Sequence, residues 1–411
     1  MIKIAVVGLG YVGLPLAVEF SKYFSVVGYD LSSSRVDSLR SGIDTTLEIE
    51  PEELKAALVN NLTVSADPSA IADSNFYIVT VPTPINDDRS PDLVPLKSAC
   101  GLIGKSLKPS DVVVFESTVY PGCTKEECIP ILASESGLVP GLDFKYGYSP
   151  ERINPGDKNK TFAKIKKVVS GCDDETAESI AAVYRRAVEA GVYIAESIEV
   201  AEAAKVIENS QRDINIAFIN ELALIFNRLN ISTSAVLDAA STKWNFLNFT
   251  PGLVGGHCIG VDPYYLAYKA GVVGMHPEVL LSGRRLNDRL HEEIARMCIK
   301  QLMASEEGLR TPKILCLGLT FKPNCPDLRN SRVLNLIKEL SEFGVQVICY
   351  DPVVNKADLP DWIVSSFIDE LPDPTEFPLA IHAVEHDNYA TYVSELKAKT
   401  PIFSVRAMGL I

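Results

Sequence analysis

The 411-residue sequence has no apolar run that approaches the roughly 18 residues of a membrane-spanning helix. It is also poor in basic residues: 39 lysines and arginines stand against 53 aspartates and glutamates, so the formal net charge is −14 at pH 7. Nucleic acids and anionic membranes bind basic surfaces, whereas acidic residues are spread along this whole chain. We therefore expect neither as a partner, and any anionic ligand must be held by local donors such as helix N-termini.

The cysteines are typical of reduced thiols rather than of a disulfide framework or a metal site. There are nine, an odd number, and no C-x-x-C pair occurs. Cys123 and Cys128 flank a Lys-Glu-Glu segment with no histidine nearby, so we predict no metal there. The N-terminus leads directly into a glycine turn at Gly8 without a signal-peptide pattern. These features together predict a cytoplasmic protein.

A glycine-rich turn near the N-terminus predicts a dinucleotide site. Residues 3–7 are an apolar run of strand type, residues 14–23 have helical spacing, and Gly8, Gly10 and Gly13 stand between them in the pattern G-x-G-x-x-G. The first glycine permits a tight turn, the second lets the backbone approach a pyrophosphate, and the third lets helix and strand pack closely. The alternative is a glycine-rich turn with a purely structural role.

The acidic residue that follows the next strand indicates which dinucleotide is bound. The strand-type run 25–29 ends at Asp30, which stands 20 positions after Gly10, the spacing expected for a ribose contact. A carboxylate there repels the 2′-phosphate of NADP, so Asp30 favours NAD. Arg35 could in principle hold that phosphate and is the alternative determinant.

Strand-type runs and helical stretches alternate over the first half of the chain, which is typical of a doubly wound sheet. The strand-type runs are 76–81, 111–115 and 168–170, and the helical stretches are 51–59, 93–107 and 124–136. Ligands of such sheets lie beyond the carboxyl ends of the strands, so the loops 81–84, 116–122 and 149–156 are candidates. Thr83 and Thr118 each follow a strand, and their hydroxyls could bind a cofactor or cap the next helix.

The segment 199–228 contains no Gly or Pro and repeats apolar residues at helical spacing, so it predicts a long helix. Lys205, Asn209 and Arg212 share one stripe of that helix, at i, i+4 and i+7. Such a stripe is usually a solvated face; the alternative is that it contributes to a site. A second long helix is predicted at 278–303.

The alternation then restarts without a glycine fingerprint, because Phe321, Lys322 and Pro323 stand where G-x-x-G would be. The pattern thus predicts two Rossmann-like, doubly wound α/β domains joined by a long central helix. The new elements are strands at 312–321, 345–351 and 378–384 and a helix at 331–343, and the predicted domains are 1–195, 196–305 and 306–411.

Residues 255–260 read GGHCIG, which raises the question of whether Cys258 is a nucleophile, a metal ligand or a small residue in a turn. Oxidation of an aldehyde to an acid needs a nucleophile on the carbonyl, and a thiolate forms a thiohemiacetal and then a thioester. A free thiol titrates near about 8.5, so a nearby cation is needed to raise the thiolate fraction. Lys205 could supply that charge.

Taken together, these segments resemble the UDP-glucose/GDP-mannose dehydrogenase family along essentially the whole chain. The matching segments are GLGYVGLPLA (8–17), VPTP (81–84), STV (117–119), PER (150–152), AAKVIEN (203–209), GGHC (255–258), Asp262 and FKPNCPDLR (321–329). ESTVYPG, SPERINPG, ENSQRD and GGHCIGVDP are most similar to the branch that oxidises UDP-N-acetylhexosamines in bacterial capsule and O-antigen synthesis. The resemblance implies a four-electron oxidation of a C6 alcohol to a uronate with two NAD, with UDP-N-acetylglucosamine as the favoured substrate.

The resemblance also implies a role for each matching position. Cys258 would be the nucleophile, and Lys205 and Asn209 would stabilise the C6 oxygen as an oxyanion. Asp262 would orient water with the lysine, and Glu151 would act as general acid and base during thioester hydrolysis. The implied cofactor contacts are Gly8, Gly10, Tyr11, Val12, Gly13, Asp30, Arg35, Thr83, Thr118 and Arg329. The implied substrate contacts are Arg152, Ile153, Lys205, Asn209, Arg212, Gly252, Phe321 and Lys322.

The helix 199–228 carries apolar residues, among them Phe218, on more than one face, and a helix of this kind must be buried on several sides. We therefore expect a homodimer that pairs through this helix, which the resemblance also implies.

Two positions depart from the glucose-type pattern, in which Ser often precedes the nucleophile and Lys precedes the aspartate. Here His257 and Val261 stand in those places, which disfavours UDP-glucose and leaves Asp262 without an adjacent cation. A role of His257 in the site and a structural role both remain open. Other substrates that remain open are UDP-GalNAc, UDP-ManNAc and UDP-glucose. A two-electron β-hydroxyacid dehydrogenase and a non-catalytic nucleotide-sugar sensor are the competing functions.

Overall fold

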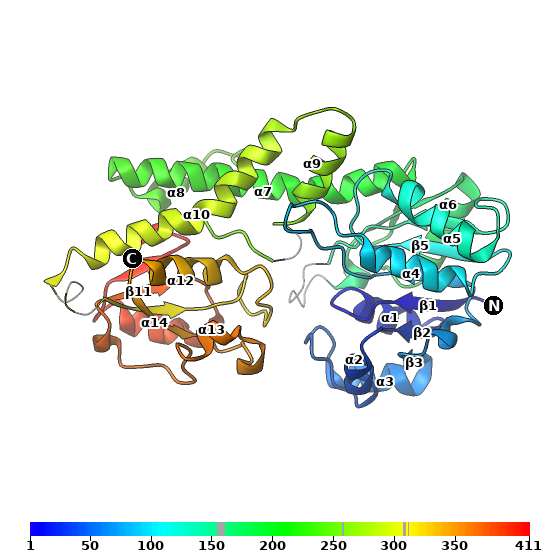
Figure 1. Cartoon of the computed structure of the whole chain (residues 1–411), viewed down its shortest axis with the longest axis horizontal. Coiled ribbons are helices and arrows are strands. Elements are labelled where there is room, and N and C mark those ends of the chain that lie inside the picture. Colours follow the sequence, from blue (N-terminus) through cyan, green and yellow to red (C-terminus); the bar gives the residue numbers. More distant parts are fainter. Residues whose placement is uncertain (154–160, 257–258, 307–309, 311) are drawn as a thin grey trace. The chain divides into compact units, whose positions relative to one another are not determined.

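The structure, a computed structural model, describes residues 1–153, 161–256, 259–306, 310 and 312–411. The predicted nucleophile Cys258 and its neighbour His257 lie outside these residues. The chain divides into two units, the first comprising residues 1–208 and 264–275 and the second residues 209–263 and 276–411. Each unit has its own sheet, as the two successions of strand-type runs and helical stretches predict (Figure 1).

The first unit is built on an eight-stranded sheet in the order β3-β2-β1-β4-β5-β6-β7-β8. The strands are β1 (Lys3–Val7), β2 (Ser25–Tyr29), β3 (Leu62–Ser65), β4 (Phe76–Val79), β5 (Val112–Phe115), β6 (Lys145–Tyr148), β7 (Lys167–Gly171) and β8 (Val192–Ile194). The order runs outward in both directions from β1, so the sheet is doubly wound as predicted. The turns after β1 and β4 therefore meet at the place where the winding reverses, which is where such sheets bind ligands.

One strand pair departs from the predicted parallel sheet. β7 pairs with β6 in antiparallel register, with Gly147 opposite Gly171 and Tyr148 opposite Ser170. A parallel neighbour needs a crossover connection, usually a helix. Within the described residues, the connection between these two strands contains only the short helical turn η3 (Phe162–Lys164). The chain therefore returns along the sheet in the opposite direction.

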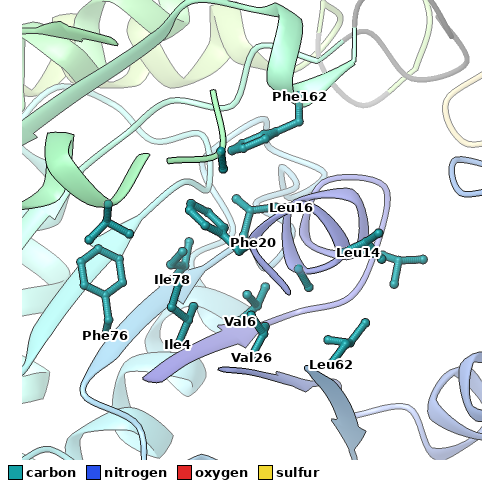
Figure 2. Close-up of a cluster of buried hydrophobic side chains, with 14 of the residues drawn as sticks. Ile4, Val6, Leu14, Leu16, Phe20, Val26, Leu62, Phe76, Ile78 and Phe162 are labelled. Atoms are coloured by element: carbon teal, nitrogen blue, oxygen red, sulfur yellow. The ribbon is translucent and has the colours of Figure 1, made fainter. Parts of the chain in front are cut away.

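Helices cover this sheet and close its core. They are α1 (Gly13–Ser21), α2 (Ser33–Arg40), α3 (Pro51–Asn60), α4 (Val94–Gly104), α5 (Ile129–Ser136) and α6 (Asp174–Tyr184). The predicted helix 124–136 is a π-helical turn, η2 (Thr124–Cys128), that continues into α5. Figure 2 shows Leu16 and Phe20 of α1 beside Ile4 of β1 and Ile78 of β4, and all four side chains are fully buried.

The second unit has a five-stranded sheet in the order β10-β9-β11-β12-β13, parallel except for the last pair. The strands are β9 (Lys313–Leu317), β10 (Gln346–Tyr350), β11 (Leu379–His382), β12 (Ile402–Ser404) and β13 (Gly409–Leu410). The helices with the largest share in its core are α10 (Glu278–Leu302) and α12 (Arg332–Glu342), both predicted, and α13 (Asp361–Val364) and α14 (Ala390–Leu396) are shorter. The core joins Ile294 and Cys298 of α10 to Leu336 and Leu340 of α12.

The turn after β9 has the same backbone plan as the glycine turn after β1. Gly8 and Gly318 both have positive φ, 99° and 89°. Each donates its N–H at 2.8 Å to the carbonyl of the last residue of the neighbouring strand, Tyr29 in one case and Tyr350 in the other. The second unit is thus a variation on the first, as the restarted alternation predicts.

α7 (Ile198–Leu229) is one uninterrupted helix of 32 residues, one residue longer at each end than predicted. The division between the two units falls inside it, between Glu208 and Asn209. The chain therefore consists of two Rossmann-like α/β domains joined by a long helix. Two shorter helices follow it, α8 (Thr233–Ser241) and α9 (Asp262–Val272). Among the described residues, no helix is long and apolar enough to cross a membrane.

Candidate active site

The three glycines of the N-terminal turn have separate tasks. Gly8 adopts a φ of 99°, and its carbonyl accepts a hydrogen bond from the Thr80 hydroxyl at 2.7 Å. A Cβ on Gly13 would lie 1.8 Å from the Gly8 carbonyl oxygen, so only glycine allows α1 to pack so closely. A Cβ on Gly10 would meet nothing within 4 Å. The space over Gly10 is therefore open to a ligand, as a pyrophosphate site requires.

Asp30 and Arg35 both contact the glycine turn, but Asp30 accepts backbone N–H groups, whereas Arg35 is paired with a carboxylate. The carboxylate of Asp30 accepts the N–H groups of Leu9 at 2.8 Å and Ser32 at 2.9 Å, and each oxygen can accept a further bond from a ribose hydroxyl. Arg35 donates to the Leu9 carbonyl at 3.0 Å and forms an ion pair of 2.8 Å with the buried Asp44. Since Asp44 neutralises the guanidinium, this arrangement favours Asp30 as the group that discriminates against a 2′-phosphate.

The two threonines that follow strands do not cap helices. α4 begins after Leu93 and η2 after Cys123, so the capping interpretation of Thr83 and Thr118 is wrong. Both side chains are partly exposed at the carboxyl ends of β4 and β5. Their predicted contact with the cofactor stays a prediction. Tyr11 and Val12, at the start of α1, are also partly exposed.

Glu151 is a buried carboxylate whose two oxygens are both occupied. Oε1 accepts the backbone N–H groups of Arg152 and Ile153 at 2.6 Å each, and Oε2 accepts from Lys167 Nζ at 2.7 Å. Burial opposes ionisation, but Lys167 and the two N–H donors outweigh it and lower the pKa of Glu151. In this structure Glu151 is thus an ionised anchor for residues 151–153, and the predicted acid–base role requires it to release one of these partners.

Lys167 links Glu151 to a second buried carboxylate. Its ammonium donates to Glu116 Oε2 at 2.6 Å, and the Tyr184 hydroxyl bonds to the other oxygen of Glu116. Burial raises the pKa of Glu116 to about 7; Lys167 opposes this shift, and the nearby charge of Glu151 adds to it. One ammonium between two buried carboxylates leaves an excess negative charge, which a proton on Glu116 removes.

The polar stripe of α7 is not uniformly solvated. Lys205 is only 9% exposed, and Arg212 is exposed. Asn209 donates its side-chain N–H at 2.5 Å to Asp262, which is 2% exposed at the start of α9. Within the described residues, no acceptor bonds to the Lys205 ammonium. The interpretation of the stripe as a solvated face is therefore wrong for Lys205. The structure brings Asn209 and Asp262 together, whereas the role that the resemblance implies for Asp262, orienting water with Lys205, stays a prediction.

The second unit contains a hollow of about 280 Å³. Its lining includes three predicted substrate contacts, Gly252, Phe321 and Lys322, and two cations that the sequence analysis missed, Arg332 and Arg406. The remaining lining comes from the segment between α8 and α9, from the turns after β9, β11 and β12 and from the start of α12: Thr250, Pro251, Leu253, Thr320, Pro323, Ser331, Val333, Ala383, Val384, Glu385 and Val405. Arg332 forms an ion pair with Asp288, and Arg406 forms one of 2.7 Å with Glu385 of the lining. Lys322 and the remaining N–H groups of the two arginines are donors that suit a diphosphate.

The glycine pair before Cys258 is covered by an aromatic ring. Gly256 has a φ of 79°, and a Cβ on it would lie 2.7 Å from the ring of Phe321. A Cβ on Gly255 would lie 2.6 Å from the Asn330 carbonyl oxygen. The space that the missing side chains leave is therefore filled by Phe321 and by backbone, so these two glycines serve close packing.

Asn220 fixes the segment that leads into this glycine pair. Its amide accepts the Gly252 N–H at 2.9 Å and donates to the Gly252 carbonyl at 3.1 Å. The same amide donates to Asn287 of α10 at 2.9 Å. A reciprocal pair of bonds from one buried amide replaces the strand neighbour that this segment lacks. No spacing in the sequence indicated Asn220, because its partners are far from it in the chain.

Two predicted arginines are held by carboxylates in this structure. Arg152 forms an ion pair of 2.7 Å with Glu208 of α7, and Arg329 forms one of 2.8 Å with Asp327. Arg329 is about half exposed, 54%, and its Nε and Nη2 donate to both oxygens of the buried Asp327, so it would have to give up these bonds to reach a ligand. Ile153 packs against the apolar core of the first unit.

Three family models match the chain in succession. They are described as the NAD binding domain, the central domain and the UDP binding domain of the UDP-glucose/GDP-mannose dehydrogenase family, and they match residues 2–188, 199–289 and 315–408. The glycine turn and Asp30 lie within the first match, so the dinucleotide for which they are built is NAD.

Named relatives match over nearly the whole chain. UDP-N-acetyl-D-glucosamine 6-dehydrogenase of Pseudomonas aeruginosa is 54% identical over 357 residues, which cover 87% of this chain and 84% of the relative. Protein CapL of Staphylococcus aureus is 49% identical over 410 residues, 99% of this chain and 96% of the relative. The solved structure of UDP-D-ManNAc dehydrogenase from Pyrococcus horikoshii aligns with a TM-score of 0.87 at 28% identity, covering 99% of this chain and 96% of that one.

Alanine substitutions at two of the glycines should separate folding from cofactor binding. Gly13→Ala places a methyl group against the Gly8 carbonyl, so we expect a loss of about 1–3 kcal/mol in the free energy of unfolding. Gly10→Ala should change that free energy by less than about 0.5 kcal/mol, yet weaken NAD binding because the methyl group stands where the pyrophosphate approaches. Urea unfolding and NAD titration measure the two effects. Unchanged NAD affinity in Gly10→Ala would contradict this role.

Glu116→Gln should change how stability depends on pH. The pKa of Glu116 in the folded chain, about 7, lies above the ordinary value of 4.5, so the folded state binds its proton more tightly than the unfolded state does. That contribution is complete below the ordinary pKa and is lost as the pH rises through the folded pKa. The stability of the wild type relative to Glu116→Gln should therefore fall between about pH 5 and about pH 8. Urea unfolding at both pH values tests this, and a difference independent of pH would show that Glu116 stays ionised.

Proposed function

The chain belongs to the UDP-glucose/GDP-mannose dehydrogenase family, and we propose that it oxidises the C6 hydroxyl of a UDP-N-acetylhexosamine to the uronate. It is an NAD-dependent dehydrogenase. UDP-N-acetylglucosamine is the favoured substrate, because the relative named for it is 54% identical in sequence, while UDP-N-acetyl-D-mannosamine dehydrogenase of Pyrococcus horikoshii is 32% identical over a similar length. In this proposal residues 1–195 bind NAD, residues 196–305 form a central domain and residues 306–411 bind the UDP-sugar. A cytoplasmic location stays a prediction.

One observation carries the proposal most directly. Phe321 lines the hollow of the second unit, and its ring packs against Gly256, two positions before Cys258 in the sequence. The Phe321 side chain thus lines the proposed substrate hollow and also packs against the glycine pair that precedes the nucleophile in the sequence. Lys322, Arg332 and Arg406 would hold the diphosphate in that hollow, since cations with several N–H donors suit phosphate oxygens.

Each residue proposed for catalysis has a separate role in the reaction. Cys258 adds to the carbonyl carbon of the C6 aldehyde, and the thiohemiacetal becomes a thioester when its hydrogen leaves as hydride. Lys205 and Asn209 stabilise the oxygen as charge develops on it, and Asp262 holds the Asn209 amide in place. Water then cleaves the thioester and returns the thiol. NAD, held at Gly10 and Asp30, supplies the hydride acceptor for both oxidations.

The α7 helix supports a proposed homodimer. Phe218, Ile225 and Leu229 are 54%, 45% and 59% exposed, and their spacing of seven and then four residues places them on one face. Trp244 and Leu247, beyond α8, are 92% and 61% exposed. The exposed apolar face of α7 indicates an interface, and a second copy of the chain that offers the same face would form an isologous pair.

The yield of NADH tests the reaction. Each mole of UDP-N-acetylglucosamine should give two moles of NADH, because the alcohol is oxidised to the acid and not only to the aldehyde. A two-electron β-hydroxyacid dehydrogenase would give one, and a nucleotide-sugar sensor none. The same absorbance assay with UDP-GalNAc, UDP-ManNAc and UDP-glucose ranks the alternative substrates by kcat/KM.

Cys258→Ser should abolish nearly all turnover and leave NAD affinity unchanged, because a hydroxyl is a far weaker nucleophile than a thiolate near neutral pH. Steady-state kinetics and NAD titration measure the two effects. The covalent route would be wrong if the serine variant kept more than roughly a tenth of the wild-type kcat.

Phe218→Glu should split the dimer, because it places a charge within the proposed apolar interface. Val59→Glu is the matched control: Val59 is 85% exposed on α3, far along the sequence from α7, and its replacement should leave the mass in solution unchanged. Sedimentation at micromolar concentration compares the three proteins. A wild-type monomer of 44.8 kDa would contradict the proposed interface.

A further inference from the structure

A buried histidine lies directly behind the substrate hollow. His386 is 2% exposed, and its Nδ1 accepts the backbone N–H of Asn324 at 2.9 Å. A ring nitrogen that accepts an N–H carries no proton, so the proton of the neutral ring resides on Nε2. Nε2 lies 3.1 Å from Asp351 Oδ2 and 3.2 Å from the Thr320 hydroxyl. The imidazole ring thus accepts a hydrogen bond at Nδ1 and can donate one at Nε2.

These bonds fasten both ends of the turn that carries Phe321 and Lys322. At its beginning, Asp351 accepts the Leu319 N–H at 2.6 Å, and the Thr320 hydroxyl donates to the Lys322 carbonyl at 3.0 Å. At its end, the Asn324 N–H is held by His386. Asn324 has a φ of 57°, a left-handed conformation that residues other than glycine adopt only when the surroundings hold them.

His386 also belongs to the opposite wall of the hollow. It directly follows Val384 and Glu385, which line the hollow beyond β11. The ring is held on this side by Tyr389, whose ring centroid lies 5.6 Å away at an interplanar angle of 81°. One side chain therefore connects the turn after β9 to the segment after β11, and the hollow lies between these two walls.

We propose that His386 is a positioning residue for the substrate: by joining the two walls, it holds Phe321 and Lys322 where they bind the UDP group. This inference rests on the proposed function, which assigns the hollow to the UDP-sugar. His386 is too deeply buried to touch the ligand itself. Its loss should weaken binding of substrate and transition state alike, so KM should rise while kcat stays nearly constant.

Two variants separate the acceptor of His386 from its donor. In His386→Asn, the amide oxygen takes the place of Nδ1 and accepts from Asn324, while the contact with Asp351 is lost. In His386→Gln, the longer amide keeps a donor near Asp351 but offers no acceptor at the position of Nδ1. His386→Ala loses both. Asp387→Ala is the control, because it removes only the exposed bond from the Asn324 side chain to Asp387, 2.9 Å long.

Calorimetric titration with UDP, together with urea unfolding, carries the test. We expect His386→Asn and Asp387→Ala to bind UDP nearly as the wild type does, and His386→Gln and His386→Ala to bind it about tenfold more weakly, the loss that one hydrogen bond accounts for. NAD affinity should stay unchanged in all four variants. Steady-state kinetics should show the loss in KM and not in kcat.

Two results would overturn the inference. If His386→Asn and His386→Gln both lost UDP affinity in proportion to their loss of folding stability, the result would mean that His386 only fills space. Wild-type affinity in His386→Gln would mean that its bond to Asn324 does not position the turn. If the alanine variant does not fold, the Asn and Gln variants carry the test alone. A wild type that does not bind UDP would instead contradict the proposed function.

Discussion

Parallel strand pairing is the constraint on which the rest of this protein depends. Because parallel strands point the same way, the turns that leave their carboxyl ends collect at one edge of each sheet. In the first unit that edge receives residues of very different sequence position: Gly8 after β1, Asp30 after β2, Thr83 after β4, Glu116 after β5 and Glu151 after β6. In the second unit it receives Phe321, Asp351, Val384 and Arg406. The strand topology thus brings the functional side chains to one edge of each sheet, whatever contacts they then make with one another.

Carboxylates fix the backbone of these turns. The same bond from a backbone N–H to a carboxylate occurs in both units, although the proposed ligands differ. Asp30 accepts the Leu9 N–H in the first unit, and Asp351 accepts the Leu319 N–H in the equivalent turn of the second. Asp30 is partly exposed, so it can also bind a ribose. Asp351 is buried against His386, and its turn continues as Phe321-Lys322-Pro323 instead of opening over glycines. The same backbone plan therefore serves a dinucleotide in one unit and, as proposed, a UDP-sugar in the other.

Much of this organisation could be predicted from the sequence, because it depends on local patterns. The glycine spacing indicated the turn and its three tasks, and the absence of Gly and Pro between 199 and 228 indicated α7 to within one residue at each end. Strands with strong apolar runs were predicted, whereas β3, β6, β8, β12 and β13 were not. β6 reads KYGY and β8 reads VYI, segments too short or too polar for periodicity to distinguish from loops.

The sequence by itself determined the α/β class, the repeated domain plan and the residue types of the proposed site, since composition and spacing act over a few residues. Only the tertiary structure decided which charges remain available. Glu151 looked like an acid–base group, but β7 returns antiparallel and brings Lys167 to one of its oxygens, while the backbone N–H groups of Arg152 and Ile153 occupy the other. Arg35 looked like a possible phosphate ligand, and Asp44 neutralises it. Asn220 and His386 gave no signal, because a buried hydrogen bond depends on the geometry of partners that lie far apart in the chain.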